Sequence, residues 1–185
     1  MGFTGHYVFG RSDRPLREAP VFDRGSPASP DDIHECWPRA GGWQTLQLTN
    51  GLWQWRHLDR LVEWSGASAC VAYIYDSDVA MVDGLDQDGR RWEAHLNAEI
   101  AAEYDEVDPQ RWLADYQATI PSRAEAAIAW ARSAGFGCDA QDQIEQLMRS
   151  EETFAEDLFV QLLDALNFPA AVDPEPADGA GSLRQ

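Results

Sequence analysis

The sequence has no long apolar run, and this absence limits where the protein can reside. No segment approaches the roughly 20 consecutive apolar residues that a membrane-spanning helix requires. The N-terminus, MGFTGHYVFGR, also lacks the basic stretch and the following apolar run that are typical of a secretory signal. We therefore expect a cytoplasmic protein that has no membrane partner.

The sequence also has few cysteines and no lysine. Its 3 cysteines, Cys36, Cys70 and Cys138, are widely separated and form no Cys-x-x-Cys pair, so reduced thiols are expected rather than a disulfide framework. A phosphate-binding loop with its lysine, a Gly-x-Ser-x-Gly elbow and a dinucleotide fingerprint are all absent. The motifs therefore assign no catalytic residue, and we expect no cofactor. An enzyme of this sequence would have to use scattered residues.

Core-forming residues are plentiful. The chain has 185 residues, among them 8 tryptophans, 7 phenylalanines and 5 tyrosines. This length fits one globular domain, and the aromatic residues together with abundant Leu, Val and Ala indicate a substantial core.

Negative charge is the strongest compositional feature, because 32 acidic residues against 14 arginines give a net charge of -18. Residues 1–60 hold seven arginines and seven acids, whereas residues 61–185 hold seven arginines and 25 acids, so the later part carries the whole excess. A field of this sign repels nucleic-acid phosphates and anionic lipid, and it speeds the encounter with a basic protein. Charge that serves only solubility is the alternative interpretation.

Apolar patterns predict an antiparallel meander in the first half of the chain. Residues 67–75 form a continuous run of small and branched apolar residues, which is typical of a central strand covered on both faces. Near residue 93 the alternation places Trp92, Ala94 and Leu96 inward and the intervening polar residues outward. The predicted strands cover residues 5–11, 42–50, 67–75, 78–84 and 90–97.

Helical spacing dominates the second half. Ser122 has capping-box spacing to Glu125, so a new helix is expected to begin after Pro121. The last helix is predicted to bury one apolar face, formed by Phe154, Leu158, Leu162 and Leu166. The predicted helices lie within residues 29–37, 51–66, 98–108, 109–121, 121–137, 138–150 and 150–169.

These elements predict an α+β fold in which a meander of about four to five strands packs against helices. We expect a single domain over residues 1–168, with a strand-rich part at 1–97 and a helical part at 98–168. Residues 169–185 have the composition of a disordered acidic tail, and its removal after Phe168 should leave the fold intact.

An aspartate-rich stretch, YDSDVAMVDGLDQDGRRWE, raises the question of a metal site. If Gly89 is taken as the obligatory glycine of a calcium loop, Gly84 falls at the first ligand position and His95 at the twelfth, where carboxylates are required. The stretch is better explained by two tight turns, which favour Asp and Gly. A magnesium site built from Asp76, Asp78 and a distant acid stays open as an alternative.

The histidines offer no complete ligand set. His34 precedes Glu35 and Cys36, but no second His-Cys pair completes a zinc site. His57 is predicted on the polar face of its helix. His6 and His95 lie in predicted strands, so they could act together only if the fold brings them close.

The chain resembles small acidic proteins of uncharacterised actinobacterial families and, in general character, the immunity proteins that neutralise polymorphic toxins. The resemblance rests on GHYVFGRSDRPL, ACVAYIYDSDVAMV and the acidic closing helix EETFAEDLFVQLLDAL. It implies an α+β protein without catalysis that binds one basic partner tightly. A field of one sign suits this role, because it raises the association rate.

On this interpretation the acidic later part of the chain is the binding surface, around an apolar anchor. The residues expected to contact a basic partner, such as a cognate toxin, are Asp86, Asp88, Glu151, Glu152, Glu156 and Asp157. Two other hypotheses remain: a metal-dependent hydrolase or nuclease that uses Asp76 and Asp78, and an acidic mimic of nucleic acid.

Overall fold

A computed structural model describes residues 2–23, 29–49, 53–104, 107–137 and 139–172. Its framework is a six-stranded sheet in the order β2-β3-β1-β4-β5-β6, in which every neighbouring pair is antiparallel. The predicted α+β fold with an antiparallel meander is therefore confirmed, with more strands than expected. The strands are β1 (Gly5–Arg11), β2 (Ile33–Pro38), β3 (Trp43–Thr49), β4 (Ala69–Tyr75), β5 (Val79–Leu85) and β6 (Arg91–Leu96).

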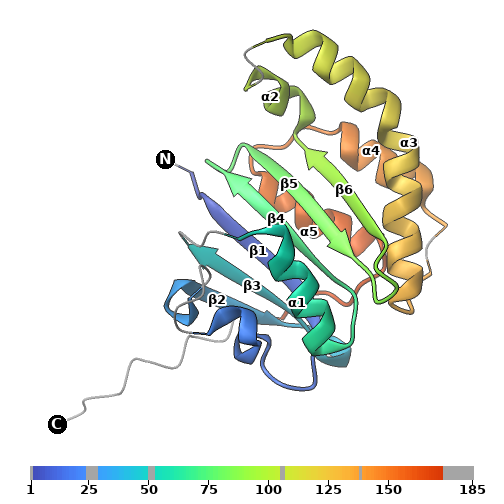
Figure 1. Ribbon diagram of the computed structural model, residues 1–185. Helices are drawn as coiled ribbons and strands as arrows, with labels where there is room; N and C mark the ends of the chain where they lie inside the picture. Colours follow the sequence, from blue (N-terminus) through green and yellow to red (C-terminus); the bar gives the residue numbers. More distant parts are fainter. Residues whose placement is uncertain (1, 24–28, 50–52, 105–106, 138, 173–185) are drawn as a thin grey trace.

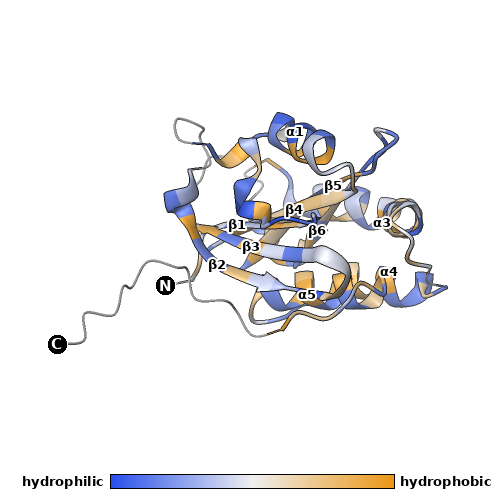
Figure 2. Ribbon diagram, turned by 90° about the horizontal axis from the view of Figure 1, so that it is seen from below, coloured by the Kyte–Doolittle hydropathy of each residue, from blue (hydrophilic) through white to orange (hydrophobic). Residues whose placement is uncertain are grey.

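Helices cover both faces and one edge of this sheet (Figures 1 and 2). Helix α1 (Trp55–Ser65) crosses one face, where Leu58 and Leu61 pack with Val8 and Leu46 of the strands. On the other face lie α4 (Gln141–Arg149) and α5 (Ala155–Ala165). The short α2 (Ala98–Glu103) follows β6, and the long α3 (Pro109–Ser133) runs along the β6 edge. Among the described residues, no helix combines the length and apolar character that a bilayer span requires.

The extra strand, β2, occupies a segment for which a helix was predicted. Ser29 does cap a helical turn, but the turn covers only Pro30–Asp32, with Ser29 Oγ accepting from Asp31 N. The chain then pairs with β3 from Ile33 onward. The prediction was wrong because the local cap signal is outweighed by the hydrogen bonds that β3 offers this segment.

Helix α3 is continuous where two helices were predicted. Pro121 lies inside it, on the exposed side, so the backbone carbonyl that proline leaves free faces water. Ile120 and Ala124, before and after the proline in the chain, are fully buried, and this packing holds the helix together across the proline. Ser122 does not cap a new helix, because its hydroxyl donates to the carbonyl of Thr119 at 2.8 Å.

Side chains of α3 also bind the outer edge of β6. The Tyr116 hydroxyl accepts a hydrogen bond from His95 N at 2.8 Å and donates one to His95 O at 2.7 Å. Arg123 donates to the Glu93 carbonyl at 3.0 Å and to its carboxylate at 2.9 Å. These bonds occupy the backbone groups of an edge strand that would otherwise be open to pairing with another chain.

The chain stays in contact with the sheet beyond Phe168, where the ordered domain was predicted to end. Arg39 is buried, and its guanidinium donates to the carbonyl of Pro169 at 2.8 Å and to Thr45 Oγ1 at 3.1 Å. Val172 N donates to the Pro38 carbonyl at 3.0 Å. The domain therefore includes residues 169–172; residues 173–185 lie outside the described part.

Two truncations test this boundary. A variant ending at Val172 should keep the melting temperature of the full chain, since it retains both contacts. A variant ending at Phe168 should lose about 2 kcal/mol of unfolding free energy, because the buried Arg39 loses a carbonyl acceptor. Urea denaturation followed by circular dichroism measures both. Equal stability of the two truncated chains would show that residues 169–172 contribute nothing.

Candidate binding site on the open sheet face

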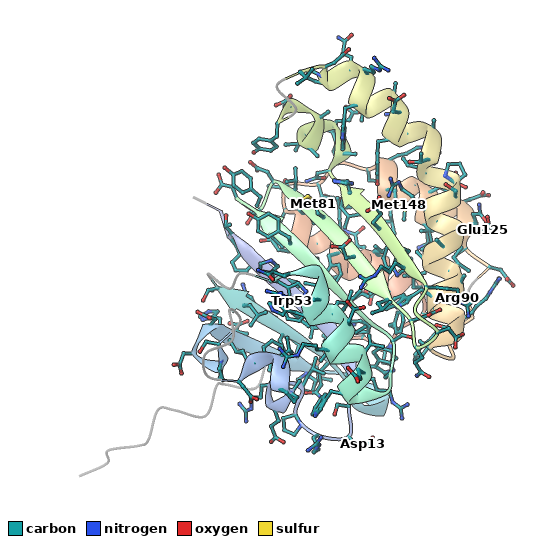
Figure 3. The ribbon with its side chains drawn as sticks, viewed as in Figure 1. Asp13, Trp53, Met81, Arg90, Glu125 and Met148 are labelled. Atoms are coloured by element: carbon teal, nitrogen blue, oxygen red, sulfur yellow. The ribbon has the colours of Figure 1, made fainter. Side chains whose placement is uncertain are left out.

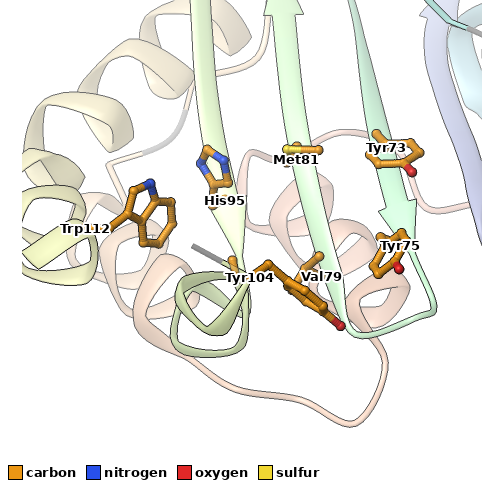
Figure 4. A pocket seen from close by; sticks show the side chains of 8 residues that line it. Tyr73, Tyr75, Val79, Met81, His95, Tyr104 and Trp112 are labelled. Atoms are coloured by element: carbon orange, nitrogen blue, oxygen red, sulfur yellow. The ribbon is translucent and has the colours of Figure 1, made fainter. Parts of the chain in front are cut away.

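Helix α1 leaves the upper end of β4, β5 and β6 uncovered, and a pocket of about 550 Å³ lies there. Met81, labelled in Figure 3, marks its floor and is 41% exposed. We refer to this cavity as the aromatic pocket, because most of its lining is aromatic. Besides Met81, the lining consists of Tyr73, Tyr75, His95, Tyr104 and Trp112. Val79 and Ala101 complete the lining (Figure 4).

Strand alternation explains how these side chains meet. In β4, Val71, Tyr73 and Tyr75 point to the same face, and burial falls along them from 3% exposed at Val71 to 42% at Tyr75. The register places Met81 of β5 beside Tyr73 on one side and beside His95 of β6 on the other. The prediction that β4 is covered on both faces is therefore wrong for its second half, where α1 no longer reaches.

The walls of the pocket come from α2 and α3. Tyr104, the residue that ends α2, meets Tyr75 edge to face, with ring centroids 5.3 Å apart and planes at 88°. Trp112, in the first turn of α3, meets His95 in a similar way at 5.3 Å and 85°. Trp112 also stacks on Tyr116 at 5.4 Å and 4°, which fixes its ring. The pocket is thus a set of aromatic walls held by contacts with one another.

Two groups of the pocket, His95 and Tyr104, are uncharged at pH 7. Burial lowers the pKa of His95, and the charge of Arg123 lowers it further against the opposing effect of Glu93. The pKa of Tyr104 is raised, first by desolvation and then by the nearby carboxylate of Asp78. The imidazole is therefore uncharged and the phenol protonated, so the charge of this site resides on its rim.

Carboxylates border the pocket at both ends. Asp76 and Asp78 lie in the turn between β4 and β5, and the Tyr104 hydroxyl is 3.4 Å from Asp78 Oδ2. At the other end Asp83 and Glu93 face each other across β5 and β6, one row below Met81 and His95. Desolvation and then the charge of Glu93 raise the pKa of Asp83, against the opposing effect of Arg91.

Further carboxylates lie next to the pocket, beyond α2. The pKa of Glu151 is raised, first by a side-chain hydrogen bond with Glu99 and then by the negative charges of Glu99 and Glu103. We define the acidic end of the molecule as six residues that converge here: Asp76, Asp78, Glu99, Glu103, Glu151 and Glu152. In the part of the chain that the structure describes, none of the six forms an ion pair.

A buried asparagine holds the acidic end together. Asn97 is fully buried, and its side-chain amide donates to the carbonyls of Asp78 at 2.6 Å and Glu152 at 2.9 Å. Its side-chain oxygen accepts from Glu152 N at 2.9 Å. One residue thus joins the β4–β5 turn, the start of α2 and the segment before α5. The sequence around Asn97 gives one local signal of this role, its place between a strand and a helix.

The structure divides the six predicted partner-binding residues into two groups at opposite ends of β5. Asp86 and Asp88 lie in the β5–β6 turn, beside Arg90, which is labelled in Figure 3 far from the pocket. Asp86 is only 2% exposed, and its carboxylate accepts from Asp88 N and Arg90 N, both at 2.9 Å. Asp88 is exposed but pairs with Arg90. Asp86 is therefore a turn-forming residue, and we leave it out of the binding surface.

The remaining four residues lie near the other end of the strand. Glu151 and Glu152 are exposed and belong to the acidic end. Asp157 is exposed in the first turn of α5. Glu156 was predicted on the outside but is half-buried, since its Oε1 accepts from Ser77 Oγ at 2.7 Å and its Oε2 is buried. Glu156 thus supports the β4–β5 turn.

The residues proposed for a metal-dependent hydrolase have other partners. Asp76 Oδ1 accepts from Gly2 N at 2.8 Å, and Asp78 faces Tyr104. Within the described ranges, no group of three or more His, Cys, Asp or Glu residues has the arrangement of a metal site. No observation in the structure therefore favours the hydrolase over a binding role.

The histidines and cysteines do not gather. His6 and His95 lie on β1 and β6, with two strands between them. Burial, with His57 adding to the effect, lowers the pKa of His6 to about 4. His57 is 2% exposed, not on a polar face, because its Nδ1 accepts from Gln54 N at 3.0 Å and caps α1. Cys70 is a buried thiol on β4 and Cys36 is half-buried on β2, whereas Cys138 lies outside the described residues.

Comparison with known proteins gives no relative from which a site could be transferred. The chain matches no family model, no curated protein and no solved structure.

Proposed function

We propose that the protein is a non-catalytic binding module that recognises a basic protein, as an immunity protein recognises its toxin. The observation that carries this proposal is the acidic end. Its six carboxylates gather beside exposed aromatic side chains, and none has an arginine partner among the described residues.

Placing like charges close together at the acidic end costs electrostatic free energy, and this cost supports a role in recognition. A hydrogen bond between the carboxyl groups of Glu151 and Glu99, which needs a proton on one of the two, raises the pKa of Glu151, and the negative charges of Glu99 and Glu103 raise it further. A protein that needs charge only for solubility can spread it, as this chain does with Glu145, which is paired with Arg149 at 3.0 Å. Concentrated unpaired carboxylates gain more when a cationic surface approaches, because the approach removes their mutual repulsion.

Exposed apolar side chains at the same end fit the same role. Tyr75, Met81 and Tyr104 are 42%, 41% and 50% exposed, and Phe154 is 52% exposed before α5. An aromatic centre with a charged rim is the usual composition of a protein interface, where the centre supplies affinity and the rim governs the association rate.

Charge reversal at the acidic end tests the proposal. Glu151→Arg with Glu152→Arg should slow association with the basic partner by about tenfold at low ionic strength. The effect should shrink above about 0.15 M salt, where the Debye length is about 8 Å. The partner is recovered on the immobilised full chain, with the product of an adjacent toxin-like reading frame as the first candidate, and rates are measured by biolayer interferometry.

The matched control reverses the same number of charges elsewhere. Asp13 and Glu18 are exposed in the N-terminal segment, and Asp13, labelled in Figure 3, lies far from the pocket. Asp13→Arg with Glu18→Arg should leave the association rate within about twofold of the native value, since screening confines each charge's effect to about 8 Å. If both pairs of reversals slow association equally, net charge alone is responsible and recognition at the acidic end is wrong.

A further inference from the structure

We propose that the aromatic pocket receives a cationic side chain, an arginine, from the basic partner. This inference rests on the proposed function and extends it, because it assigns the anchor that the acidic rim surrounds.

The walls of the pocket are suited to a cation. Tyr73, Tyr75, Tyr104 and Trp112 come from β4, the end of α2 and the start of α3, so they surround a side chain from several directions (Figure 4). The faces of such rings carry negative potential, and a cation within about 6 Å of a ring centroid gains from it. Tyr75 and Tyr104, with planes at 88°, form two adjacent walls of a cage.

The carboxylates of the rim carry negative charge, which complements a cationic occupant of the pocket but not an apolar or an anionic one. Asp78 lies 3.4 Å from the Tyr104 hydroxyl, and Asp83 and Glu93 form the row of the sheet next to Met81 and His95 at the opposite end. An apolar side chain would desolvate Asp78 and Asp83 with no return, whereas a guanidinium group offers them donors. Within the protein, Arg123 is already bound to Glu93 and stacked on Tyr116 at 5.2 Å, so it lies behind the wall and not in the pocket.

Size and chemistry favour arginine over other cations. The pocket of about 550 Å³ has room for a long side chain together with part of its backbone. The planar guanidinium group stacks on aromatic rings and is less strongly hydrated than an ammonium group, so it loses less on entering a site with apolar walls. The thioether of Met81 on the floor adapts to the aliphatic part of such a side chain.

The test compares N-acetyl-arginine methylamide with N-acetyl-citrulline methylamide, which has nearly the same shape without the charge. Binding is followed by the indole N–H resonance of Trp112 in the 15N-labelled full chain, assigned with Trp112→Phe. We expect a saturable shift with the arginine derivative and at least fivefold weaker binding of the citrulline derivative. N-acetyl-norleucine methylamide serves as an apolar probe. Equal binding of the arginine and citrulline derivatives, or tighter binding of the norleucine derivative, would show an apolar pocket and overturn the proposal.

Two variants place the binding in the pocket. Tyr75→Ala with Tyr104→Ala should abolish the arginine-dependent shift while changing the melting temperature little, because the two residues are 42% and 50% exposed. Phe154→Ala removes another exposed ring outside the pocket and should leave the shift intact. An undiminished shift in the double variant would contradict the assignment.

Experiments with the protein partner separate this inference from the proposed function. If reversal of Glu151 and Glu152 slows association but Tyr75→Ala with Tyr104→Ala leaves the dissociation constant unchanged, the acidic end recognises the partner and the pocket does not hold its anchor. If the pocket variant weakens the complex at least tenfold, the arginine anchor is supported.

Discussion

Replacing Gly84 by alanine should destabilise the protein by about 3 kcal/mol, at the upper end of what overpacking costs. Gly84 lies opposite Trp92 in the β5–β6 pair, and the indole ring covers it. A Cβ at this position would lie only 1.8 Å from Trp92 Nε1, so the ring would have to move.

The surroundings leave Trp92 little freedom to move. It is 5% exposed and packs against Trp130 at 5.4 Å between ring centroids. Trp130 is itself held, since its Nε1 donates to the Leu85 carbonyl at 3.1 Å. Strain introduced at Gly84 would therefore spread into the junction between the sheet and α3.

Urea denaturation checks this expectation, with a glycine of the same chain as the control. Gly137 has no atom within 4 Å of an added Cβ and no positive φ, so Gly137→Ala should change the unfolding free energy by less than about 0.5 kcal/mol. In the Gly84→Ala background, Trp92→Leu should cost less than it does alone, because it removes the clash. Equal effects of Gly84→Ala and Gly137→Ala would show that Trp92 is not fixed over β5.

The sheet was predictable from the sequence where its residues alternate clearly. Trp92, Ala94 and Leu96 are buried as predicted, because β6 has one face on the core and the other open. The buried apolar face of the last helix was predicted correctly except for one residue. Leu158, Leu162 and Leu166 are buried, but Phe154 is exposed because it precedes the helix as its N-cap and does not share its face.

The errors arose where distant contacts outweigh a local signal. The cap at Ser29 predicted a helix, but β3 offers strand pairing from Ile33 onward. Pro121 predicted a break, but the buried residues on either side of it keep α3 intact. Neither β3 pairing nor the packing of α3 can be seen in a window of ten residues, so the local rule alone gives the wrong element.

The pocket had a signal in the sequence that was interpreted differently. Tyr73 and Tyr75 alternate with Ala72 and Ile74. This alternation favours a strand with one buried apolar face and one face that is partly open to solvent, rather than two covered faces. Of the acidic residues predicted to bind a partner, Glu151 and Glu152 lie at the acidic end, whereas Asp86 and Asp88 lie in the β5–β6 turn at the other end of β5. Which end of a hairpin faces a neighbouring helix depends on the topology of the whole sheet.

Replacing Asn97 by alanine should have the other large effect, a loss of about 4 kcal/mol of unfolding free energy. Three hydrogen bonds from a fully buried side chain would be lost, at about 1 kcal/mol each. The backbone adds to the cost, because Asn97 has φ 56° and ψ 48°, a left-handed conformation that costs alanine about 1 kcal/mol more.

Glycine at this position separates the two contributions. Asn97→Gly keeps the left-handed backbone but loses the three bonds, so it should be about 1 kcal/mol more stable than Asn97→Ala. The Asp78 turn would no longer be joined to α2, which carries Tyr104 at its end. We therefore also expect Asn97→Gly to weaken the binding of the arginine derivative, with faster hydrogen exchange at the Glu152 amide as a direct sign of the lost bond.

Asn167 provides the matched control for this experiment. It has a comparable left-handed backbone, with φ 65°, but it is exposed and its side chain makes one hydrogen bond, to the Gly137 carbonyl at 2.6 Å. Asn167→Gly should therefore change the unfolding free energy by less than about 1 kcal/mol and leave arginine binding unchanged. If Asn97→Gly and Asn167→Gly are equally mild, the acidic end does not depend on Asn97, and the pocket must be held in shape by the contacts of its aromatic walls alone.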